Sequence, residues 1–239
     1  MDSIKDIKNI YYINLESRLD RKNFIEKQMN ILGLNARRFN AITHARGAIG
    51  CSLSHLQLLK MAKEQNLDHI LILEDDIHFI NPGLFVSNIN NFLKNHKNFD
   101  VLLIAGNNVG NYTIIDKNCV KIESCQTATG YLVRKHYFDK LIHNFENGVN
   151  KLTKAPSLEK FYAVDQNWKS LQLYDKWYLL TPLCVSQKPN YSDIEKKIMN
   201  YNSDMLILDK KKFSFQTKNL NLLKKQNSLP NSMNSIIFN

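Results

Sequence analysis

The sequence of 239 residues lacks the segments by which exported and membrane-spanning chains are usually recognised. No apolar run approaches the roughly 20 residues that a helix needs to cross a bilayer. Residues 1–8 are too polar for a secretory signal peptide. We therefore expect a cytoplasmic protein without a transmembrane segment.

Cysteine is also scarce, with four residues and no Cys-x-x-C pair. The spacing lacks the clustering that is typical of zinc-binding domains. We expect reduced thiols at Cys51, Cys119, Cys125 and Cys184, with a Cys119–Cys125 disulfide as the alternative.

Acidic residues are fewer than basic ones, with 22 aspartates and glutamates and 32 lysines and arginines. The sequence shows no internal repeat. The length suits one large domain with a buried core, or one domain with a tail. The net charge of +10 favours anionic partners such as nucleotides, phosphorylated glycans, nucleic acid or an acidic membrane surface. Part of this excess lies in residues 210–212 and 224–225, so the net charge indicates little about any cleft.

Runs rich in β-forming residues alternate with helical patterns over the first two thirds of the chain. We expect strands at residues 10–15, 36–39, 70–73, 100–105, 127–133, 177–180 and 183–186. We expect helices from Asp20 to Gly33, from Ser52 or Ser54 onward, and at residues 136–145 and 163–173. The alternation predicts a three-layer α/β domain, a mostly parallel sheet flanked by helices. Residues 195–239 are rich in Asn and Lys without a sustained period, and we expect them to wrap the domain or to be partly disordered.

Three consecutive acids, Glu74, Asp75 and Asp76, follow the apolar strand at residues 70–73. Carboxylates at a strand end are costly to desolvate unless a positive charge lies among them. Mg²⁺ or Mn²⁺ meets this need, because both prefer carboxylate oxygens and keep positions open for phosphates. The carboxyl ends of strands are also where open α/β sheets bind ligands. The alternative is an acidic turn that faces water.

Two arginines follow the first predicted strand. Arg18 and Arg21 lie three residues apart at the start of a predicted helix and could hold a diphosphate bidentately. The loop backbone at Asn14 could contact the edge of a nucleotide base. The alternative is that the arginines form surface ion pairs with Asp20 and Glu16.

A glycine-containing stretch, with Gly47 and Gly50, opens the second predicted helix. Free N–H groups at a helix N-terminus bind anions, although a lone Gly-x-x-Gly spacing is a weak signal. His55 follows on the same helix, and a buried or capping histidine is the alternative to a ligand.

Seven short motifs follow one another in a specific order. They are Ile13-Asn14-Leu15 with Arg18 and Arg21, Phe39-Asn40-Ala41-Ile42, Gly50-Cys51-Ser52-Leu53-Ser54-His55, Leu73-Glu74-Asp75-Asp76, Thr129-Gly130-Tyr131-Leu132-Val133, Val164-Asp165, and Ser192-Asp193-Ile194. Together they resemble glycosyltransferase family 25, which contains the lipooligosaccharide galactosyltransferases of bacteria and the collagen hydroxylysine glycosyltransferases. The resemblance covers residues 10–194. One departure follows Asp165, where Gln166-Asn167-Trp168 stands in place of an earlier aromatic or apolar residue.

The resemblance implies a GT-A-type nucleotide-sugar-binding domain over residues 1–194 and a UDP-sugar donor, either UDP-galactose or UDP-glucose. It implies that Mn²⁺ or Mg²⁺ is ligated by Glu74, Asp76 and Asp193, with Asp76 as the principal ligand. It implies contacts to the donor from Asn14, Leu15, Arg18, Arg21, Ala41, Gly50, Ser54, His55 and Asp75. Asp165 becomes the candidate catalytic base or acceptor-positioning group, with a helix N-cap as the alternative.

The implied reaction joins a hexose to a hydroxyl acceptor. This acceptor is either a hydroxylysine or galactosyl-hydroxylysine of a collagen-like protein, or a lipooligosaccharide glycan. Two alternatives from other classes are a basic nucleic-acid-binding protein and a catalytically inactive sugar-nucleotide-binding module. The first lacks basic residues interleaved with aromatics and leaves the acidic triplet unexplained, so we expect no nucleic-acid partner.

Overall fold

An eight-stranded mixed sheet forms the centre of the protein in the computed structural model, which describes residues 1–192, 194 and 196–210. Its strand order is β2-β1-β3-β8-β5-β9-β7-β6. The strands are β1 (Ile10–Asn14), β2 (Arg37–Asn40), β3 (His69–Glu74), β5 (Val101–Asn108), β6 (Tyr112–Ile114), β7 (Cys119–Ile122), β8 (Cys125–Arg134) and β9 (Trp177–Leu180).

Six of the eight strands run in the same direction, because only β8 and β7 are antiparallel to their neighbours on both sides. The predicted α/β class with a mostly parallel sheet flanked by helices is confirmed. Two small antiparallel pairs accompany this sheet, β4 (Ile77–Phe79) with β10 (Val185–Gln187) and β11 (Asn190–Ser192) with β12 (Lys197–Met199).

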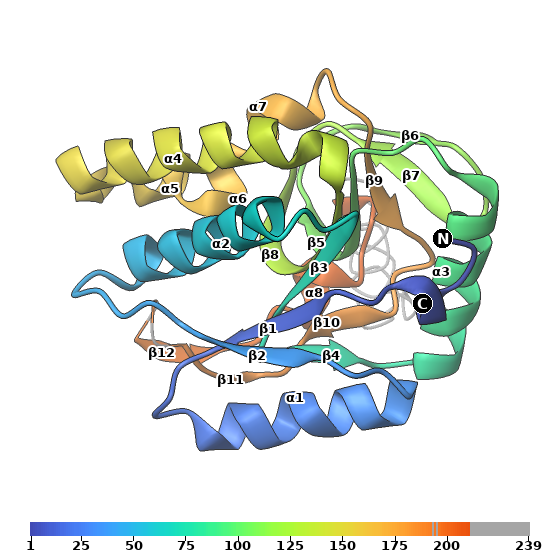
Figure 1. Ribbon diagram of the computed structural model, residues 1–239, viewed down its shortest axis with the longest axis horizontal. Helices are drawn as coiled ribbons and strands as arrows, with labels where there is room; N and C mark the ends of the chain where they lie inside the picture. Colours follow the sequence, from blue (N-terminus) through green and yellow to red (C-terminus); the bar gives the residue numbers. More distant parts are fainter. Residues whose placement is uncertain (193, 195, 211–239) are drawn as a thin grey trace, which may run out of the picture. The chain divides into compact units, whose positions relative to one another are not determined.

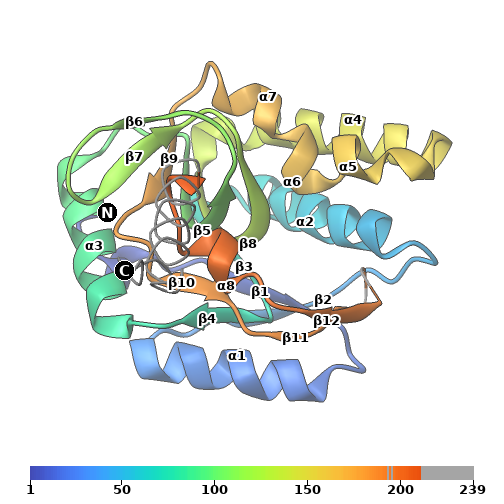
Figure 2. The same cartoon turned by 180° about the vertical axis from the view of Figure 1, so that it is seen from behind.

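Four long helices cover the sheet: α1 (Leu19–Leu32), α2 (Gly47–Glu64), α3 (Pro82–Asn95) and α4 (Phe138–Lys154). Figures 1 and 2 show α2 and α4 on one side of the sheet and α1 on the other. Shorter helical pieces are α5 (Glu159–Tyr162), α6 (Val164–Asn167), α7 (Lys169–Gln172), α8 (Asn202–Met205), and the 3₁₀ turns η1 (Ile4–Asp6), η2 (Lys135–Tyr137) and η3 (Pro156–Leu158).

The sheet separates two apolar cores, and β3 contributes alternate residues to each. Ile70 and Ile72 pack in the core that contains the buried residues of α2 and α4. Leu71 and Leu73 pack in the core that contains those of α1 and α3. Because successive side chains of a strand point to opposite faces, a strand buried on both faces is a continuous apolar run. This explains the uninterrupted Ile-Leu-Ile-Leu stretch before the acidic triplet.

The first helix differs from the prediction at its start and agrees at its end. The helix α1 begins at Leu19 after Arg18, and Asp20 lies within its first turn, so the predicted cap at Asp20 is wrong. Gly33 ends the helix with a φ of 64°, a left-handed conformation that glycine adopts without strain.

The second helix begins five residues before the earlier of its two predicted starts. The helix α2 begins at Gly47, and therefore Ser52 and Ser54 lie inside it. Their hydroxyls donate to the carbonyls of Ala48 and Gly50, each at 2.8 Å. A serine can satisfy its hydroxyl in this way within a helix, which is why it marks a start only ambiguously.

The predicted helix at residues 163–173 is divided into α6 and α7 by Trp168. The Trp168 side chain is fully buried, and its Nε1 donates to the carbonyl of Cys125 at 2.9 Å. The helix α3 was not predicted, although Pro82 at its first turn and the Asn81 side chain, which accepts from the amide of Leu84, are ordinary start signals.

The compact unit that contains all these elements runs from Met1 to Leu208. Within it, Met205 of α8 is completely buried in the same core as α1 and α3. The boundary predicted at residue 194 therefore falls before the end of this unit. Residues 211–239 of the predicted extension lie outside the described residues.

All four cysteines are free thiols, so the Cys119–Cys125 disulfide is not formed. Within the described part of the chain, no helix has both the length and the apolar character required to cross a bilayer.

Candidate active site

The candidate site lies at the carboxyl ends of the neighbouring parallel strands β1 and β3. Ile13 of β1 lies opposite Glu74, the last residue of β3. The residues that follow this pair, Asn14 and Asp75, therefore meet at the same edge of the sheet. The Asn14 side-chain amide donates to Asp75 Oδ2 at 2.7 Å. Parallel pairing thus brings together two sequence motifs that are 61 residues apart.

The Asn14 side chain is buried and fully engaged with the protein itself. Its amide nitrogen also donates to the carbonyl of Arg18, and its oxygen accepts from Arg38 Nε at 2.9 Å. Its backbone carbonyl accepts from the amide of Ala41 at 3.0 Å. Asn14 therefore orients Asp75 and joins β1 to the loop after β2.

Arg21 of α1 is the counter-charge of the acidic triplet. Its Nη1 contacts Asp75 Oδ1 at 2.9 Å and Asp76 Oδ2 at 3.0 Å, and its Nη2 donates to the carbonyl of Tyr191 at 2.9 Å. The Arg21 Nε is buried without a hydrogen-bond partner among the described residues. A planar guanidinium with a free donor beside two carboxylates can hold an additional anionic oxygen.

Asp76 is the least compensated carboxylate of the triplet. Its Oδ1 is buried and has no hydrogen-bond partner in the part of the chain that the structure describes. Burial and the neighbouring Glu74 raise the pKa of Asp76 to about 8, against the opposing effect of Arg21. Burial likewise raises the pKa of Asp75, with Arg21 and Asn14 opposing that rise. An unpaired carboxylate oxygen among acids fits a divalent cation, which would supply the missing positive charge.

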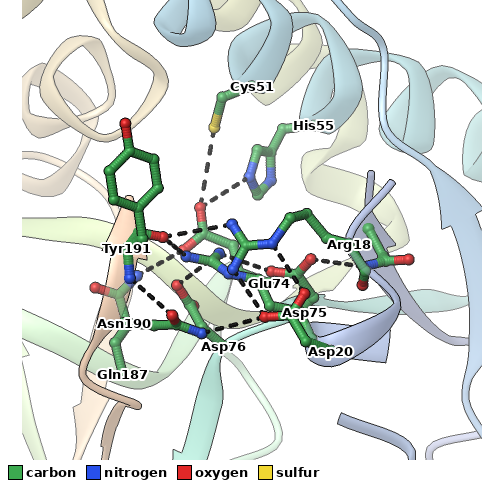
Figure 3. Close-up of polar contacts among 12 residues, drawn as sticks. Arg18, Asp20, Cys51, His55, Glu74, Asp75, Asp76, Gln187, Asn190 and Tyr191 are labelled. Carbon is green, nitrogen blue, oxygen red and sulfur yellow. Dashed lines mark hydrogen bonds and ion pairs between the residues drawn. The ribbon is translucent and has the colours of Figure 1, made fainter. Parts of the chain in front are cut away.

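Glu74 points toward α2, away from the arginine. Its Oε1 lies 3.7 Å from His55 Nε2 and 3.9 Å from Cys51 Sγ, and its Oε2 accepts from Gln187 at 2.9 Å (Figure 3). Burial and the Glu74 charge raise the pKa of the Cys51 thiol. The ligand atoms of Cys51, His55 and Glu74 lie within 4.8 Å of one another, close enough to share a metal ion.

His55 is completely buried and held in one orientation. Its Nδ1 lies 2.8 Å from the hydroxyl of Tyr131, and the two rings stack. Its Nε2 faces Glu74 and, within residues 1–192, 194 and 196–210, has no hydrogen-bond partner. Tyr131 therefore fixes the imidazole with its second nitrogen aimed at the acidic triplet.

Asp165 belongs to a second cluster, on α6. Its Oδ2 accepts from the amide of Thr127 at 2.9 Å and from the Gln166 side chain at 3.2 Å. Burial raises the pKa of Asp165, while the Thr127 hydrogen bond and the Lys169 charge oppose that rise. Ser52 of α2 accepts from the amide of Val164 at 3.2 Å and so fixes the start of α6.

The backbone beside Asp165 is unusual. Thr127 has a φ of 71°, a left-handed conformation that is rare for a β-branched residue. Its hydroxyl is buried, and no described residue forms a hydrogen bond with it. Such strain is found mainly at functional sites. Asp165 receives its hydrogen bond from this strand residue, so the alternative of a helix N-cap does not describe it.

The other predicted donor contacts occupy structural positions. Arg18 forms a bidentate pair with Asp20 at 3.0 Å, which matches the surface-pair alternative, and its Nη1 also reaches the carbonyl of Tyr191 at 3.4 Å. Leu15 is half-buried and accepts from the amide of Arg18. Asp193, the third predicted metal ligand, lies outside the described residues.

Gly50 and Ser54 connect α2 to the loop after β2. A Cβ on Gly50 would lie 2.6 Å from the carbonyl of Ile42, and the Gly50 amide donates to the carbonyl of Arg46. Ser54 accepts from the amide of Ile42 at 2.8 Å. The Gly50 amide is thus engaged, and the glycine permits a close approach of helix and loop.

Several site residues were missed in the sequence. Arg38, Gln187 and Tyr191 contact Asn14, Glu74 and Arg21 from distant parts of the chain. Only Cys51 carried a local signal, because it precedes His55 by four residues and therefore shares its helix face.

A sequence profile described as "Glycosyltransferase family 25 (LPS biosynthesis protein)" matches residues 43–168. This segment includes α2, the acidic triplet and Asp165. Two curated relatives, each named "Glycosyltransferase 25 family member", come from Anopheles gambiae and Aedes aegypti. Each is 31% identical in an alignment that covers 30% of this chain and 17% of the relative, so the match spans a minor part of the relatives' length.

Solved structures resemble the fold only distantly. A mannose-1-phosphate geranyltransferase from Thermus thermophilus has a TM-score of 0.42 and 8% identity, over 71% of this chain and 58% of that one. A glycosyltransferase involved in glycosylation of the major capsid of PBCV-1 has a TM-score of 0.39 and 10% identity, over 73% of this chain and 92% of that one. Such scores identify neither a substrate nor a reaction.

Proposed function

The chain belongs to glycosyltransferase family 25, and we propose that it transfers galactose or glucose from a UDP-sugar to a hydroxyl acceptor with the help of a divalent cation. The observation that carries this proposal is two buried polar atoms without hydrogen-bond partners among the described residues, Asp76 Oδ1 and Arg21 Nε, on side chains that contact each other. One atom lacks a positive partner and the other lacks an acceptor. A cation–diphosphate pair supplies both.

Asp76 is the principal metal ligand in this proposal, with Glu74 beside it, and Mn²⁺ or Mg²⁺ is the metal. When bound, the metal stabilises the negative charge that develops on the UDP leaving group. Arg21 then offers its Nε to a diphosphate oxygen, while its contacts to Asp75 and Tyr191 keep the guanidinium in place. Asp75 thus orients the arginine and the loop after β1.

Asp165 is the proposed catalytic base or positioning group for the acceptor hydroxyl. The Thr127 amide holds its Oδ2 and so keeps the carboxylate in one orientation, as a group that accepts a proton from a hydroxyl requires. The Lys169 charge opposes the rise in the Asp165 pKa that burial causes, and it therefore favours the carboxylate form that a base requires.

Two acceptor classes are carried forward. One is a hydroxylysine or galactosyl-hydroxylysine of a collagen-like protein, and the other is a lipooligosaccharide glycan. The profile's description names LPS biosynthesis, which supports the glycan, whereas nothing in the described side chains favours one acceptor over the other.

A donor and acceptor array tests the proposal. Full-length protein is incubated with Mn²⁺ and UDP-galactose or UDP-glucose, together with hydroxylysine peptide, galactosyl-hydroxylysine peptide or lipooligosaccharide. We expect UDP release from one donor, with a hexose added to one acceptor in the mass spectrum. Absence of UDP release from both donors at every acceptor would overturn the proposal.

The Asp76→Asn variant isolates the metal site. We expect turnover to fall at least about 100-fold, because a metal supplies several kcal/mol of charge stabilisation. The fold should remain, since Arg21 keeps its contact with Asp75. The matched control is Asp139→Asn, which removes an exposed partner of Lys63 and should leave turnover unchanged.

A further inference from the structure

A second cluster of metal-ligating side chains lies at the β7–β6 edge of the sheet and shares no residue with the candidate active site. It consists of His96, Asp116 and Cys119, whose ligand atoms all lie within 4.8 Å of one another. His96 caps the end of α3, Asp116 lies in the turn between β6 and β7, and Cys119 begins β7. Figures 1 and 2 show α3 beside β6 and β7 in both views.

Backbone amides hold the Asp116 side chain in place without a bound ion. Its Oδ1 accepts from the amides of Asn118 and Cys119 at 2.7 and 3.0 Å. Its Oδ2 is thereby turned toward His96, and the distance to His96 Nε2 is 2.8 Å. One carboxylate oxygen therefore holds the turn while the other is directed into the cluster.

The His96 ring is held between aromatic neighbours. Its centroid lies 5.0 Å from that of Phe92 and 6.2 Å from that of Tyr178, with which it stacks. A ring fixed in this way directs Nε2 at Asp116 and Cys119 without further ordering. Support of the first ligands by surrounding groups is a general feature of metal sites.

Cys119 is the third potential ligand of the cluster. Its side chain is fully buried, and its Sγ lies 3.7 Å from His96 Nε2. The His96 and Asp116 side chains are 21% and 33% exposed, so an ion and a water molecule can reach the cluster from solvent.

Two of the three distances within the cluster fit a tetrahedral zinc ion after a small adjustment. With ordinary zinc bond lengths, a histidine nitrogen lies about 3.5 Å from a thiolate sulfur and about 3.4 Å from a carboxylate oxygen. The first distance is 3.7 Å here, and the second must open from 2.8 Å by about half an ångström. That change replaces the His96–Asp116 hydrogen bond with two bonds to the metal.

We propose that His96, Asp116 and Cys119 bind one zinc ion, with a water molecule as the fourth ligand. As the ion binds, the Cys119 thiol releases its proton to solvent and ligates as the thiolate. One thiolate and one imidazole favour zinc, whereas Mn²⁺ and Mg²⁺ prefer a shell of oxygen atoms. The ion ties the end of α3 to the β6–β7 hairpin at the edge of the sheet. It is distinct from the cation proposed for glycosyl transfer and does not depend on that proposal.

Cobalt(II) tests the site, because it replaces zinc and absorbs light when a thiolate ligates it. Metal-free full-length protein is titrated with Co²⁺ alone. We expect a thiolate-to-cobalt charge-transfer band and intense tetrahedral d–d bands that saturate at one equivalent, and their loss when Zn²⁺ is added. Absence of these bands in the folded wild-type protein would overturn the proposal.

Matched variants assign the ligands. Cys119→Ser should abolish the charge-transfer band, while Cys51→Ser, in the candidate active site, should retain it. His96→Gln and Asp116→Asn should each weaken zinc binding by more than about tenfold, since even changes around a metal site cost that much. Zn²⁺ should raise the Tm of the wild-type protein and of Asp76→Asn, but not that of His96→Gln. A band that persists in Cys119→Ser, or that is lost in Cys51→Ser, would contradict the assignment.

Discussion

Arg21 and Asp75 were both predicted as donor contacts, and the structure places them in contact with each other at 2.9 Å. Both side chains are largely buried, so the two charges interact with little screening by water. The arginine therefore has two tasks in the proposed reaction, to compensate the acidic triplet and to offer its remaining donor to a phosphate. A sequence pattern identifies charges that belong to one site, whereas contacts decide which charge meets the ligand.

The pH dependence of turnover should report on Asp165. A general base acts as the carboxylate, so kcat/KM falls as pH drops through its pKa, which burial raises above the usual range. The Lys169 charge opposes that rise, and Lys169→Gln removes the charge. We expect the acidic limb of the kcat/KM profile to move to higher pH in Lys169→Gln, measured at saturating Mn²⁺.

Two controls accompany this profile. Lys94→Gln, at the exposed end of α3, removes the same charge from a helix that packs in the other core from α6, and it should leave the limb in place. Asp165→Asn should lose the limb together with most of the turnover. A limb that stays in place in Lys169→Gln would mean that another group titrates.

At the level of elements, β8 is the antiparallel strand between β3 and β5, and it carries a glycine, Gly130, at a crowded position of the sheet. A Cβ on Gly130 would lie 2.8 Å from side-chain carbons of Ile104 and Ile77, both of them buried. The strand β8 positions Tyr131, and Tyr131 positions His55. This arrangement therefore requires a glycine at position 130.

Gly130→Ala should therefore lower the free energy of unfolding by about 1–3 kcal/mol, the usual cost of overpacking a core. Gly83→Ala is the matched control, because its new Cβ would meet nothing nearer than the Asn81 side chain at 3.8 Å. In a helix this control should be neutral or stabilising by up to about 1 kcal/mol. Urea unfolding of both variants measures the difference, and equal stabilities would contradict the crowding.

For the compact unit as a whole, the last described helix belongs to the core of the catalytic fold. Met205 of α8 is fully buried, and Asn202 accepts a hydrogen bond from Ser186 of β10 at 2.7 Å. The main chain thus returns to the sheet after the last family motif. Residues 196–208 are part of the unit that must fold for the site to form.

Met205→Ala in the full-length chain should reduce the free energy of unfolding by about 2–5 kcal/mol, as expected for a truncated buried side chain. Ile198→Ala is the control, because Ile198 is 79% exposed, and its effect should stay within about 0.5 kcal/mol. Chemical denaturation distinguishes the two. Equal and small effects would place α8 outside the cooperative unit.

The sequence alone determined the fold class and the place of the acidic triplet. Strands buried on both faces are apolar throughout, and helices carry one apolar stripe, so local patterns reveal them. The strand end at Glu74 and the left-handed stop at Gly33 could be predicted for this reason. Helix starts at Ser54 and Asp20 were misplaced, because these side chains form equally good hydrogen bonds or ion pairs inside a helix.

Only the tertiary structure decided which groups meet. The spacing of the cysteines gave no sign of a metal cluster, yet folding brings Cys119 to His96, 23 residues earlier in the chain. Likewise, Gln187 reaches Glu74 across 113 residues. Local propensity is a property of neighbouring residues, whereas a site is assembled from strand ends that pair across long loops. The residue types of this protein's site could therefore be predicted from its sequence, whereas the packing of the sheet determined which of these residues contact one another.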